Sequence, residues 1–419
     1  INTFMKGPET MSKFETYFLM NDQDVIEYVK EKLDIFPADA VLTSKEIGDG
    51  NLNYVFRVKE ESTGKSVIVK QAGGEARISA DIKLSTDRTR IEAEILKKQG
   101  ELAPGLVPEV YLYDAVMCSC TMEDLFDYTI MRTALMNHEK FPHFADQIST
   151  FMVNTLLGTT DVCVEHKAKK DDVKNYINPE LCEISEDLVY TEPFNNIGNR
   201  NNVFPPVSDF VQKELYEDTA LHLEAAKCKF EFMNNAQSLI HGDLHTGSIF
   251  INDHSTKIFD PEFAFYGPMG YDIGNVVANM FFAWNNGTFT IEDEAEKADF
   301  TGWVEQSVED TIDLFIAKYG RYYDENVKDH MAKTPGFKEW YLGTILRDTA
   351  AVAGLELVRR IVGLANVKDI TTIADESKRA AAEKICILTA KSFIMNRDSF
   401  KTGKDFTGAL KDAVAKVTV

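Results

Sequence analysis

The residues that decide the fold run from 241 to 262 and read HGDLHTGSIFINDHSTKIFDPE. Inside this stretch, the apolar run 249–251 and the alternating run Lys-Ile-Phe over 257–259 lie on either side of a turn that begins with Asn-Asp. Short apolar strands joined by such a turn are typical of a β-hairpin. The sequence therefore predicts a loop that leads directly into a hairpin.

Three carboxylates lie at the ends of this predicted hairpin: Asp243 precedes its first strand, and Asp260 and Glu262 follow its second. We expect them to converge on one cleft. Like charges so close together raise one another's pKa unless a cation lies between them. Mg²⁺ bound by one or two carboxylates and nucleotide phosphates meets that need, so Asp260 and Glu262 are the predicted metal ligands. Asp243 is predicted to orient an attacking hydroxyl and accept its proton in phosphoryl transfer.

The order of these parts resembles the kinase catalytic loop H-x-D-x-x-x-x-N followed by a metal-binding element of the D-F-G kind. Here Ser248 stands in the place of the Asn, and the metal element reads Asp-Pro-Glu over 260–262. Among small-molecule kinases related to the aminoglycoside phosphotransferases, the run HGDLHTGS with Asp-Pro-Glu downstream resembles the S-methyl-5-thioribose kinase family. Because of Ser248, the number of metal ions stays open, and Glu262 is the alternative second contact.

This resemblance implies a two-lobed protein-kinase-like fold of the α+β class, with a small β-rich N-lobe and a larger helical C-lobe. It implies ATP and Mg²⁺ as cofactors, and transfer of the γ-phosphoryl group to the 1-hydroxyl of S-methyl-5-thio-D-ribose in methionine salvage. It is also compatible with a homodimer. We therefore expect a tail over residues 1–10, a nucleotide-binding N-lobe over 11–125, and a catalytic and substrate-binding C-lobe over 126–419.

The composition narrows the class of partner. With 45 Lys and Arg against 67 Asp and Glu, the formal net charge is −22, which disfavours nucleic acid and anionic membranes as partners. There is no run of about 18 apolar residues, so a membrane span is not expected. The six cysteines contain no C-x-x-C pair, which indicates buried thiols in a reducing compartment and hence a cytoplasmic protein.

A glycine-rich turn is the candidate phosphate-binding loop. It spans residues 48–53, between strands expected over 42–47 and 54–58. Glycine lets backbone N–H groups approach a phosphate closely, although a Gly-Asp-Gly turn alone is more often a simple hairpin turn. The predicted nucleotide contacts in this loop are Gly48, Gly50, Asn51 and Asn53.

The next predicted strand, 66–70, ends in Lys70. A lysine at the end of an apolar strand, one hairpin after a glycine-rich turn, is arranged like the V-A-I-K lysine of kinases, which holds the α- and β-phosphates. The helix predicted over 87–99 contains Glu92 and Glu94, and either could form an ion pair with Lys70. The spacing does not choose between them.

Two further strands are predicted over 110–114 and 115–125, which completes a five-stranded N-lobe sheet. In the family that the sequence resembles, the crossover between the lobes binds the adenine edge through backbone groups. By position, that role falls to residues 122–125, and Glu123 and Leu125 are the predicted contacts.

The rest of the chain is predicted to be mainly helical. Residues 165–205 are polar and punctuated by Asn and Pro, and they predict a short helix and an exposed loop. After Glu262, a segment rich in glycine and aromatic residues contains Asp272, which the resemblance implies braces the catalytic loop by hydrogen bonds. The predicted helices span 144–157, 207–232, 273–284, 303–319, 337–363 and 373–395.

Arg359 and Arg360 are adjacent in a strongly apolar predicted helix. Burying a guanidinium group without a partner is unfavourable, so at least one of the pair should face an acid or a cavity. The resemblance implies that both contact the sugar and the phosphoryl region. The alternative is that they reach solvent or brace neighbouring acids.

Two other functions stay open. A related kinase acting on choline, an aminoglycoside or homoserine would share the phosphotransfer site. The first two acceptors are cationic and favour an acid-rich pocket, whereas the arginine pair favours a neutral, hydroxyl-rich acceptor. A nucleotide-binding pseudokinase scaffold is the second alternative, because Ser248 replaces the Asn of the kinase pattern.

Overall fold

The computed structural model describes residues 12–47, 53–73, 75–76, 79–83 and 85–418. Two compact units divide the chain. The first contains the chain up to Lys97 together with Pro108–Leu125, and the second contains Lys98–Val107 together with the chain from Phe126 onward. Residues 98–107, expected in the N-lobe, therefore cluster with the second unit. The predicted tail over 1–10 lies outside the described residues.

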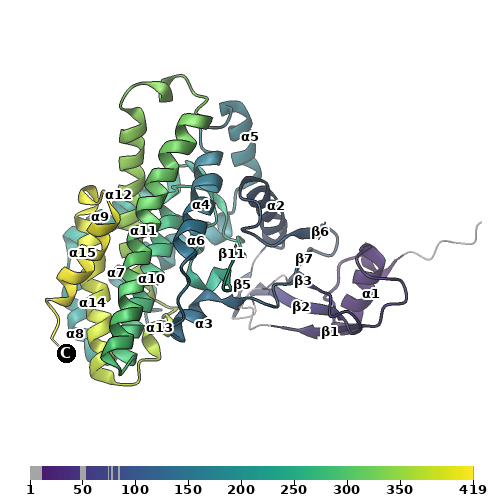
Figure 1. The fold of residues 1–419 in the computed structure, drawn as a ribbon, viewed down its shortest axis with the longest axis horizontal. Coiled ribbons are helices and arrows are strands. Elements are labelled where there is room, and N and C mark those ends of the chain that lie inside the picture. The colour runs from purple at the N-terminus through teal and green to yellow at the C-terminus, as the bar shows by residue number, and fades with distance from the viewer. Residues whose placement is uncertain (1–11, 48–52, 74, 77–78, 84, 419) are drawn as a thin grey trace, which may run out of the picture. The chain divides into compact units, whose positions relative to one another are not determined.

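The first unit is built on a sheet. Its elements, most of which are labelled in Figure 1, are η1 (Lys13–Glu15), α1 (Asp22–Lys32), β1 (Leu42–Glu46), β2 (Asn53–Glu60), β3 (Ser66–Ala72), β4 (Glu75–Ala76), β5 (Ser79–Lys83), the larger part of α2 (Asp87–Leu102), β6 (Val110–Asp114) and β7 (Ser119–Glu123). Five of the strands form an antiparallel sheet in the order β1-β2-β3-β7-β6. The five-stranded N-lobe sheet predicted from the sequence is therefore present.

Strand β3 shows how this sheet places a charged side chain. Alternate residues of a strand face opposite sides of the sheet. Val67 and Val69 pack with Val25 and Val29 of α1 in the core. Lys70, one residue on, faces the opposite side and meets α2 there.

The second unit is mostly helical. Its α-helices are α3 (Met131–Met136), α4 (Phe144–Leu156), α5 (His166–Asn175), α6 (Pro179–Leu188), α7 (Glu192–Asn195), α8 (Ser208–Val211), α9 (Thr219–Asn234), α10 (Gly270–Thr290), α11 (Glu294–Asn326), α12 (Phe337–Val362), α13 (Lys368–Thr371), α14 (Glu376–Met395) and α15 (Gly403–Val414). The predicted α+β class, with a small β-rich part and a larger helical part, is confirmed. Among the helices of the described residues, none combines the length and apolar character that crossing a bilayer requires.

The predicted hairpin is confirmed within the second unit. Strands β10 (Ile249–Ile251) and β11 (Thr256–Ile258) pair antiparallel, and β8 (Thr129–Ile130) pairs with the other edge of β10. Outside the hairpin, β9 (Ser238–Ile240) pairs with β12 (Phe265–Gly267). Because β9 ends just before His241 and β12 begins just after Glu262, this second ladder brings both ends of the stretch 241–262 together.

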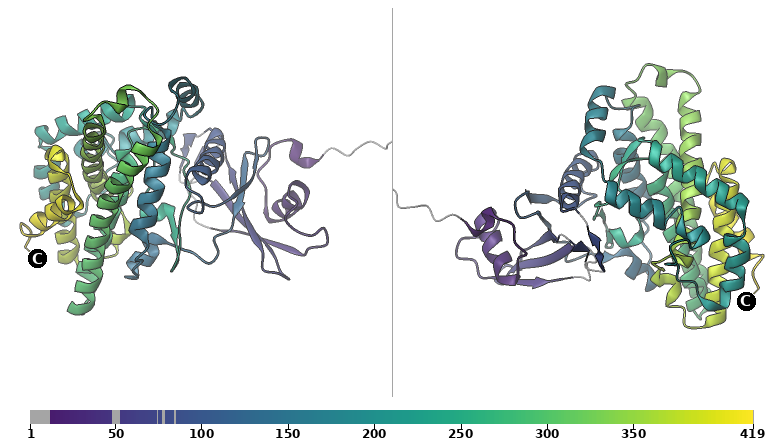
Figure 2. Two further views of the ribbon diagram at one scale, coloured as in Figure 1. Left: turned by 45° about the horizontal axis from the view of Figure 1, so that its top comes forward. Right: turned by 180° about the vertical axis from the view of Figure 1, so that it is seen from behind.

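The core of the second unit is formed by helices that approach closely at glycines. Nearly every residue of α10 is buried. A Cβ at Gly274 of α10 would lie 2.7 Å from the backbone N of Ala353 and the backbone O of Thr349, both in α12. A Cβ at Gly354 of α12 would lie 2.7 Å from the backbone O of Ala390 in α14. Helices α10, α12 and α14 therefore run side by side in the bundle that Figures 1 and 2 show.

Replacing Gly274 with alanine should destabilise the protein, because α10 and α12 would have to separate. An overpacked core site typically costs about 1–3 kcal/mol of unfolding free energy. Urea denaturation measures the change. Gly302→Ala in α11 is the matched control, since no atom of the described residues lies within 4 Å of its added Cβ, and it should raise the unfolding free energy by about 0.5–1 kcal/mol. Equal stability of Gly274→Ala and wild type would contradict the close approach of the two helices.

Two predicted elements are interrupted by aspartate side chains. The strand expected over 115–125 is reduced to β7, because Asp114 Oδ1 accepts hydrogen bonds from the backbone N–H groups of Val116 and Met117 and forms a turn. The helix expected over 207–232 is divided into α8, one π-helical turn and α9. A new helix, α9, begins after Asp218, because Oδ1 of Asp218 accepts the backbone N–H of Leu221 and caps the N-terminus of that helix.

Two other segments contain more helix than predicted. Residues 165–205, expected to hold one short helix and a loop, contain α5, α6 and α7. The helix expected over 303–319 extends over all of α11, because Asp293 Oδ1 accepts the N–H groups of Ala295 and Glu296 and starts the helix earlier.

Candidate active site

Asp272 fixes the backbone that leads to Asp243. It lies in the first turn of α10, fully buried. Its Oδ2 accepts the backbone N–H of His241 at 2.7 Å, and its Oδ1 accepts that of Gly242 at 3.0 Å. Burial raises the pKa of the Asp272 carboxyl to about 6, although both N–H donors favour the charged form. One carboxylate therefore holds two successive residues of the loop.

Gly242 allows this loop to lie against the chain that follows Asp-Pro-Glu. Its φ is +81°, in the left-handed region that favours glycine. A Cβ at this position would lie only 2.3 Å from the carbonyl oxygen of Phe263. The residue before Asp243 and the residue after Glu262 are therefore in backbone contact.

His241 forms a second link between the two segments. Its Nδ1 accepts the backbone N–H of Asp243 at 3.2 Å, and its Nε2 lies 2.9 Å from the carbonyl oxygen of Phe259. A backbone N–H can only donate and a carbonyl can only accept, so the ring is neutral with its proton on Nε2. His241 thus ties the position of Asp243 to the residue that precedes Asp260.

Asp243 is half-buried and has a basic group near each carboxylate oxygen. Nη2 of Arg359 lies 3.7 Å from Oδ1, and Nε2 of His245 lies 3.3 Å from Oδ2. Burial acts to raise the pKa of the Asp243 carboxyl, but the N–H of the nearby His245 and the positive charge of Arg359 hold it well below its usual range. Asp243 is therefore ionised at neutral pH, as a group that accepts a proton must be.

The metal element 260–262 has an unusual backbone. Asp260 has φ +65°, a left-handed conformation that aspartate tolerates better than most residues and that is often found at functional sites. The side-chain N–H of Asn178 donates to the carbonyl oxygens of Glu262 at 2.8 Å and Ala264 at 3.2 Å. Asn178, which immediately precedes α6, was not predicted from the sequence. It holds the chain on which both predicted metal ligands lie.

The convergence of Asp243, Asp260 and Glu262 on one cleft stays a prediction. Across the described residues, no three or more His, Cys, Asp or Glu side chains are grouped as ligands of a metal ion. At Asp243, the carboxylate oxygens lie near His245 and Arg359. The carboxylates of Asp260 and Glu262 remain suitable donors in kind, because Mg²⁺ prefers oxygen ligands and commonly takes only one or two from protein carboxylates.

Arg359 and Arg360 lie in the last turn of α12 and share one acid. Glu356, one turn earlier and 1% exposed, forms an ion pair with Nε of Arg359 and lies 3.8 Å from Nε of Arg360. The acid that the partly buried arginines require is thus Glu356, which sequence reasoning missed. Its spacing of three and four residues from the pair, within an apolar helix, is the signal that would have identified it.

A third arginine, Arg132 of α3, also lies at this site and was missed. Its Nη2 donates to Oδ1 of Asn279 at 3.0 Å, and its Nε lies 3.6 Å from Asp369. Asn279 in turn donates to Glu356 at 3.2 Å, which joins Arg132 to the arginine pair. Burial, with the positive charges of Arg132 and Arg359, lowers the pKa of Arg360 to about 10.

In the first unit, Lys70 has Glu92 as its partner. Nζ of Lys70 lies 2.9 Å from Oε2 of Glu92, and both side chains are buried. Glu94 pairs instead with Arg90, 2.9 Å away on the same helix. Of the two glutamates that the sequence allowed as partners of Lys70, the structure thus shows Glu92 in the ion pair.

The remaining predicted nucleotide contacts are only partly described. Asn53 is buried and its Oδ1 accepts Nε of Arg88 at 3.2 Å. Glu123 accepts the backbone N–H of Glu109 at 3.1 Å, and Leu125 is buried. The other three contacts lie outside the described residues: Gly48, Gly50 and Asn51.

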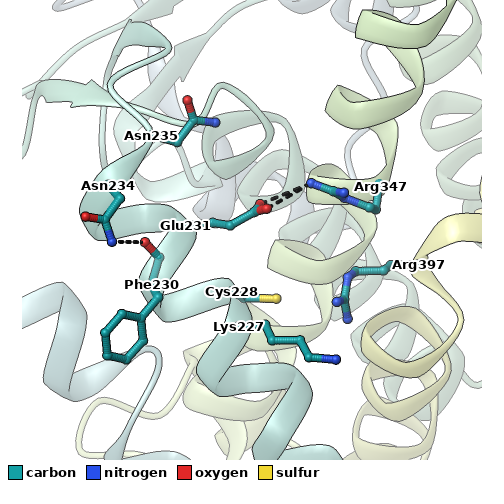
Figure 3. Close-up of a pocket in the computed structure, with 8 residues that line it drawn as sticks. All are labelled: Lys227, Cys228, Phe230, Glu231, Asn234, Asn235, Arg347 and Arg397. Carbon is teal, nitrogen blue, oxygen red and sulfur yellow. Dashed lines mark hydrogen bonds and ion pairs between the residues drawn. The ribbon is translucent and has the colours of Figure 1, made fainter.

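A separate surface pocket of about 700 Å³ lies beside α9 (Figure 3). It is lined by Lys227, Cys228, Phe230, Glu231, Asn234, Asn235, Arg347 and Arg397. Its basic side chains are paired with acids: Arg347 with Glu231 at 3.1 Å, and Arg397 with Glu224 at 2.6 Å. None of the predicted site residues that the structure describes lines this pocket, so we do not assign it to the candidate active site.

The chain is similar to known phosphotransferases. Residues 201–304 match the Phosphotransferase enzyme family. The chain is 36% identical over 384 residues to a methylthioribose kinase from Bacillus pumilus (strain SAFR-032), which covers 91% of this chain and 94% of the relative. It is 37% identical over 388 residues to a methylthioribose kinase from Geobacillus sp. (strain WCH70), covering 92% and 94% respectively. These similarities confirm the predicted kinase-like phosphotransferase class.

Among solved structures, a choline kinase from Cryptosporidium parvum Iowa II covers 94% of this chain and 96% of its own, with 10% identity and a TM-score of 0.48. A spectinomycin phosphotransferase in complex with ADP and spectinomycin covers 90% of this chain and 98% of its own, with 12% identity and a TM-score of 0.46.

Proposed function

This chain belongs to the methylthioribose kinase family, and we propose that it is an ATP-dependent sugar kinase of methionine salvage. The reaction is transfer of the γ-phosphoryl group of ATP to the 1-hydroxyl of S-methyl-5-thio-D-ribose. The products are the 1-phosphate of the sugar and ADP. The observation that supports this proposal most directly is the ionised, backbone-braced carboxylate of Asp243 beside Arg359.

In this proposal, Asp243 accepts a hydrogen bond from the 1-hydroxyl and takes its proton as the oxygen attacks the γ-phosphorus. The bond between the γ-phosphorus and its bridging oxygen breaks, and that oxygen leaves with ADP. Asp272 keeps the loop in place through the N–H groups of His241 and Gly242. Because Asp243 is already ionised, no earlier deprotonation step is needed.

The metal and the basic groups have the following proposed roles. Asp260 and Glu262 would hold Mg²⁺, which when bound neutralises charge on the phosphate oxygens. Arg359 and Arg360 would contact the sugar and the transferred phosphoryl group. Glu356 keeps both guanidinium groups oriented. A neutral, hydroxyl-bearing acceptor fits this basic site better than a cationic one.

In the first unit, Lys70 would hold the α- and β-phosphates of ATP, oriented by its ion pair with Glu92. The phosphates would also contact the turn 48–53, through Gly48, Gly50, Asn51 and Asn53. Glu123 and Leu125 would bind the adenine edge through backbone groups.

We further propose a cytoplasmic homodimer that binds neither nucleic acid nor membranes. The net charge of −22 supports the last point, and light scattering coupled to gel filtration tests the dimer.

The decisive experiment measures ADP release with a panel of acceptors: S-methyl-5-thio-D-ribose, choline, an aminoglycoside and homoserine. We expect turnover with the thiosugar and a kcat/KM at least about a hundredfold lower for the others, a loss of the size expected when buried polar groups are left unpaired. Faster turnover of choline, the aminoglycoside or homoserine would replace the proposed substrate. Thermal stabilisation by Mg-ATP without turnover of any acceptor would favour the pseudokinase scaffold instead.

Replacing Glu92 with glutamine should raise the KM for ATP about tenfold, because Lys70 would lose a charged hydrogen-bond partner worth about 1.5 kcal/mol or more. Steady-state kinetics with varied ATP measures the change. Glu94→Gln is the matched control on the same helix. Its ion pair with Arg90 lies at the surface, so its KM should change less than about twofold. Equal effects of the two substitutions would exclude Glu92 as the orienting group.

A further inference from the structure

His245 lies two residues after Asp243, and its hydrogen bonds define where its proton is. Nδ1 accepts the backbone N–H of Gly247 at 3.0 Å and lies 3.3 Å from the hydroxyl of Ser248. Because a backbone N–H can only donate, Nδ1 must carry a lone pair rather than a proton. This excludes the charged imidazolium form, in which both nitrogens are protonated. The ring is therefore neutral, with its single proton on Nε2.

That proton lies on the ring nitrogen that is near the candidate catalytic carboxylate. Nε2 lies 3.3 Å from Oδ2 of Asp243, just beyond the usual distance range of a hydrogen bond. Catalytic hydrogen bonds are often long in the resting enzyme and shorten in the reacting complex. The other carboxylate oxygen, Oδ1, faces Arg359 instead. The two oxygens of Asp243 are thus in different surroundings.

The surroundings of His245 preserve this arrangement. A Cβ at Gly247 would lie 2.8 Å from Cε1 of His245 and 2.9 Å from Nη1 of Arg132. Glycine at this position therefore allows both side chains to pack against the loop. The charges of Asp243, of Arg132 in α3 and of Arg360 in α12 act on the ring. Burial lowers the pKa of His245, Asp243 acts in the opposite direction, and the two arginines lower it again. These effects agree with the neutral ring that the hydrogen bonds require.

We propose that His245 is a positioning residue for Asp243. Through Nε2–H it holds Oδ2, which leaves Oδ1 to accept the proton of the substrate hydroxyl. The N–H of Gly247 fixes the tautomer that makes this possible. The proposal rests on the assignment of Asp243 as the proton acceptor, and it adds a second side chain to the catalytic loop that does not itself contact the reacting atoms.

Two substitutions of His245 separate this role from a purely structural one. In His245→Asn, the short amide can accept the N–H of Gly247 but offers no donor near Asp243. In His245→Gln, the longer side chain can place an amide N–H near the position of Nε2. We expect His245→Asn to lower kcat by about tenfold to a hundredfold, the size of effect that a misplaced catalytic group produces, with the KM for ATP unchanged. His245→Gln should restore at least about a third of the lost rate.

The control is His254→Asn, which removes an exposed ring in the turn between β10 and β11 and should leave kcat unchanged. Equal losses in His245→Asn and His245→Gln, or no loss in either, would overturn the positioning role. The thermal unfolding midpoint of each variant shows whether the loop remains folded.

A spectroscopic readout tests the same inference without turnover. In protein labelled with ¹⁵N-histidine, long-range ¹H–¹⁵N correlations distinguish the two neutral tautomers and the charged ring, and His245→Asn identifies the signal. We expect the Nε2–H tautomer at neutral pH and a shift of that resonance in Asp243→Asn. An Nδ1–H tautomer, a charged ring or an unchanged resonance would overturn the proposal. Absence of thiosugar phosphorylation together with the expected spectrum would reject the proposed function alone.

Discussion

The Asp243→Asn enzyme should phosphorylate the thiosugar about 10² to 10⁴ times more slowly than wild type, the usual contribution of a positioned base. Asparagine keeps the size of the side chain but cannot take the proton of the attacking hydroxyl. It also leaves the pairs of Asp272 with His241 and Gly242 intact, so the loop should keep its conformation. The effect should therefore appear in kcat and not in ATP binding.

Steady-state kinetics and the shift of the unfolding midpoint by Mg-ATP test this together. We expect an unchanged Mg-ATP shift alongside the lost turnover. Asp253→Asn is the matched control, since Asp253 is an exposed acid in the turn of the same hairpin and should retain full activity. A kcat for Asp243→Asn within about threefold of wild type would refute its assignment as proton acceptor.

The Glu356→Gln protein is expected to be strongly destabilised. Glu356 is the acid that Arg359 and Arg360 share, and Asn279 links it to Arg132. Removing one partner of a buried ion pair leaves the other charge uncompensated, which typically costs about 3–5 kcal/mol. Glutamine keeps the shape, so the loss should come from the missing charge rather than from a cavity.

Urea denaturation gives the change in unfolding free energy for this variant. Glu339→Gln, an exposed position in the first turn of the same helix, should change it by less than about 0.5 kcal/mol. Adding Arg360→Leu to Glu356→Gln should restore part of the loss, because one of the uncompensated like charges is then removed. A Glu356→Gln protein as stable as wild type would show that the arginines are satisfied by other groups.

Much of the fold could be predicted because its signals are local. The hairpin follows from two apolar runs and a turn, and the placement of Lys70 follows from a strand of alternating residues and a glycine-rich turn. The predicted bounds of an element were wrong where a single polar side chain forms a turn or a helix cap inside an apolar run. Asp114 forms a turn inside a run that looked like continuous strand, and Asp218 caps a new helix inside a run that looked like one helix.

The acidic residues of the candidate site could be predicted from the sequence, but most of the side chains that hold the site in place could not. Asp272 was assigned from the family pattern, and its two backbone hydrogen bonds fit that role. Asn178 and Arg132 meet the site only because distant segments fold together, since Asn178 is 84 residues from Glu262 and Arg132 is 147 residues from Asn279. No local spacing indicates such partners. Glu356 is different, because its distance from the arginine pair was readable in the sequence.

The brace formed by Asp272 has a consequence for how binding free energy is used. The loop before Asp243 is held by a buried side chain of the protein's own core helix, so its geometry does not depend on the arrival of either substrate. A substrate that meets a preformed loop loses little conformational entropy in ordering it. More of the interaction free energy can then stabilise the transition state, which favours a high kcat over tight ground-state binding.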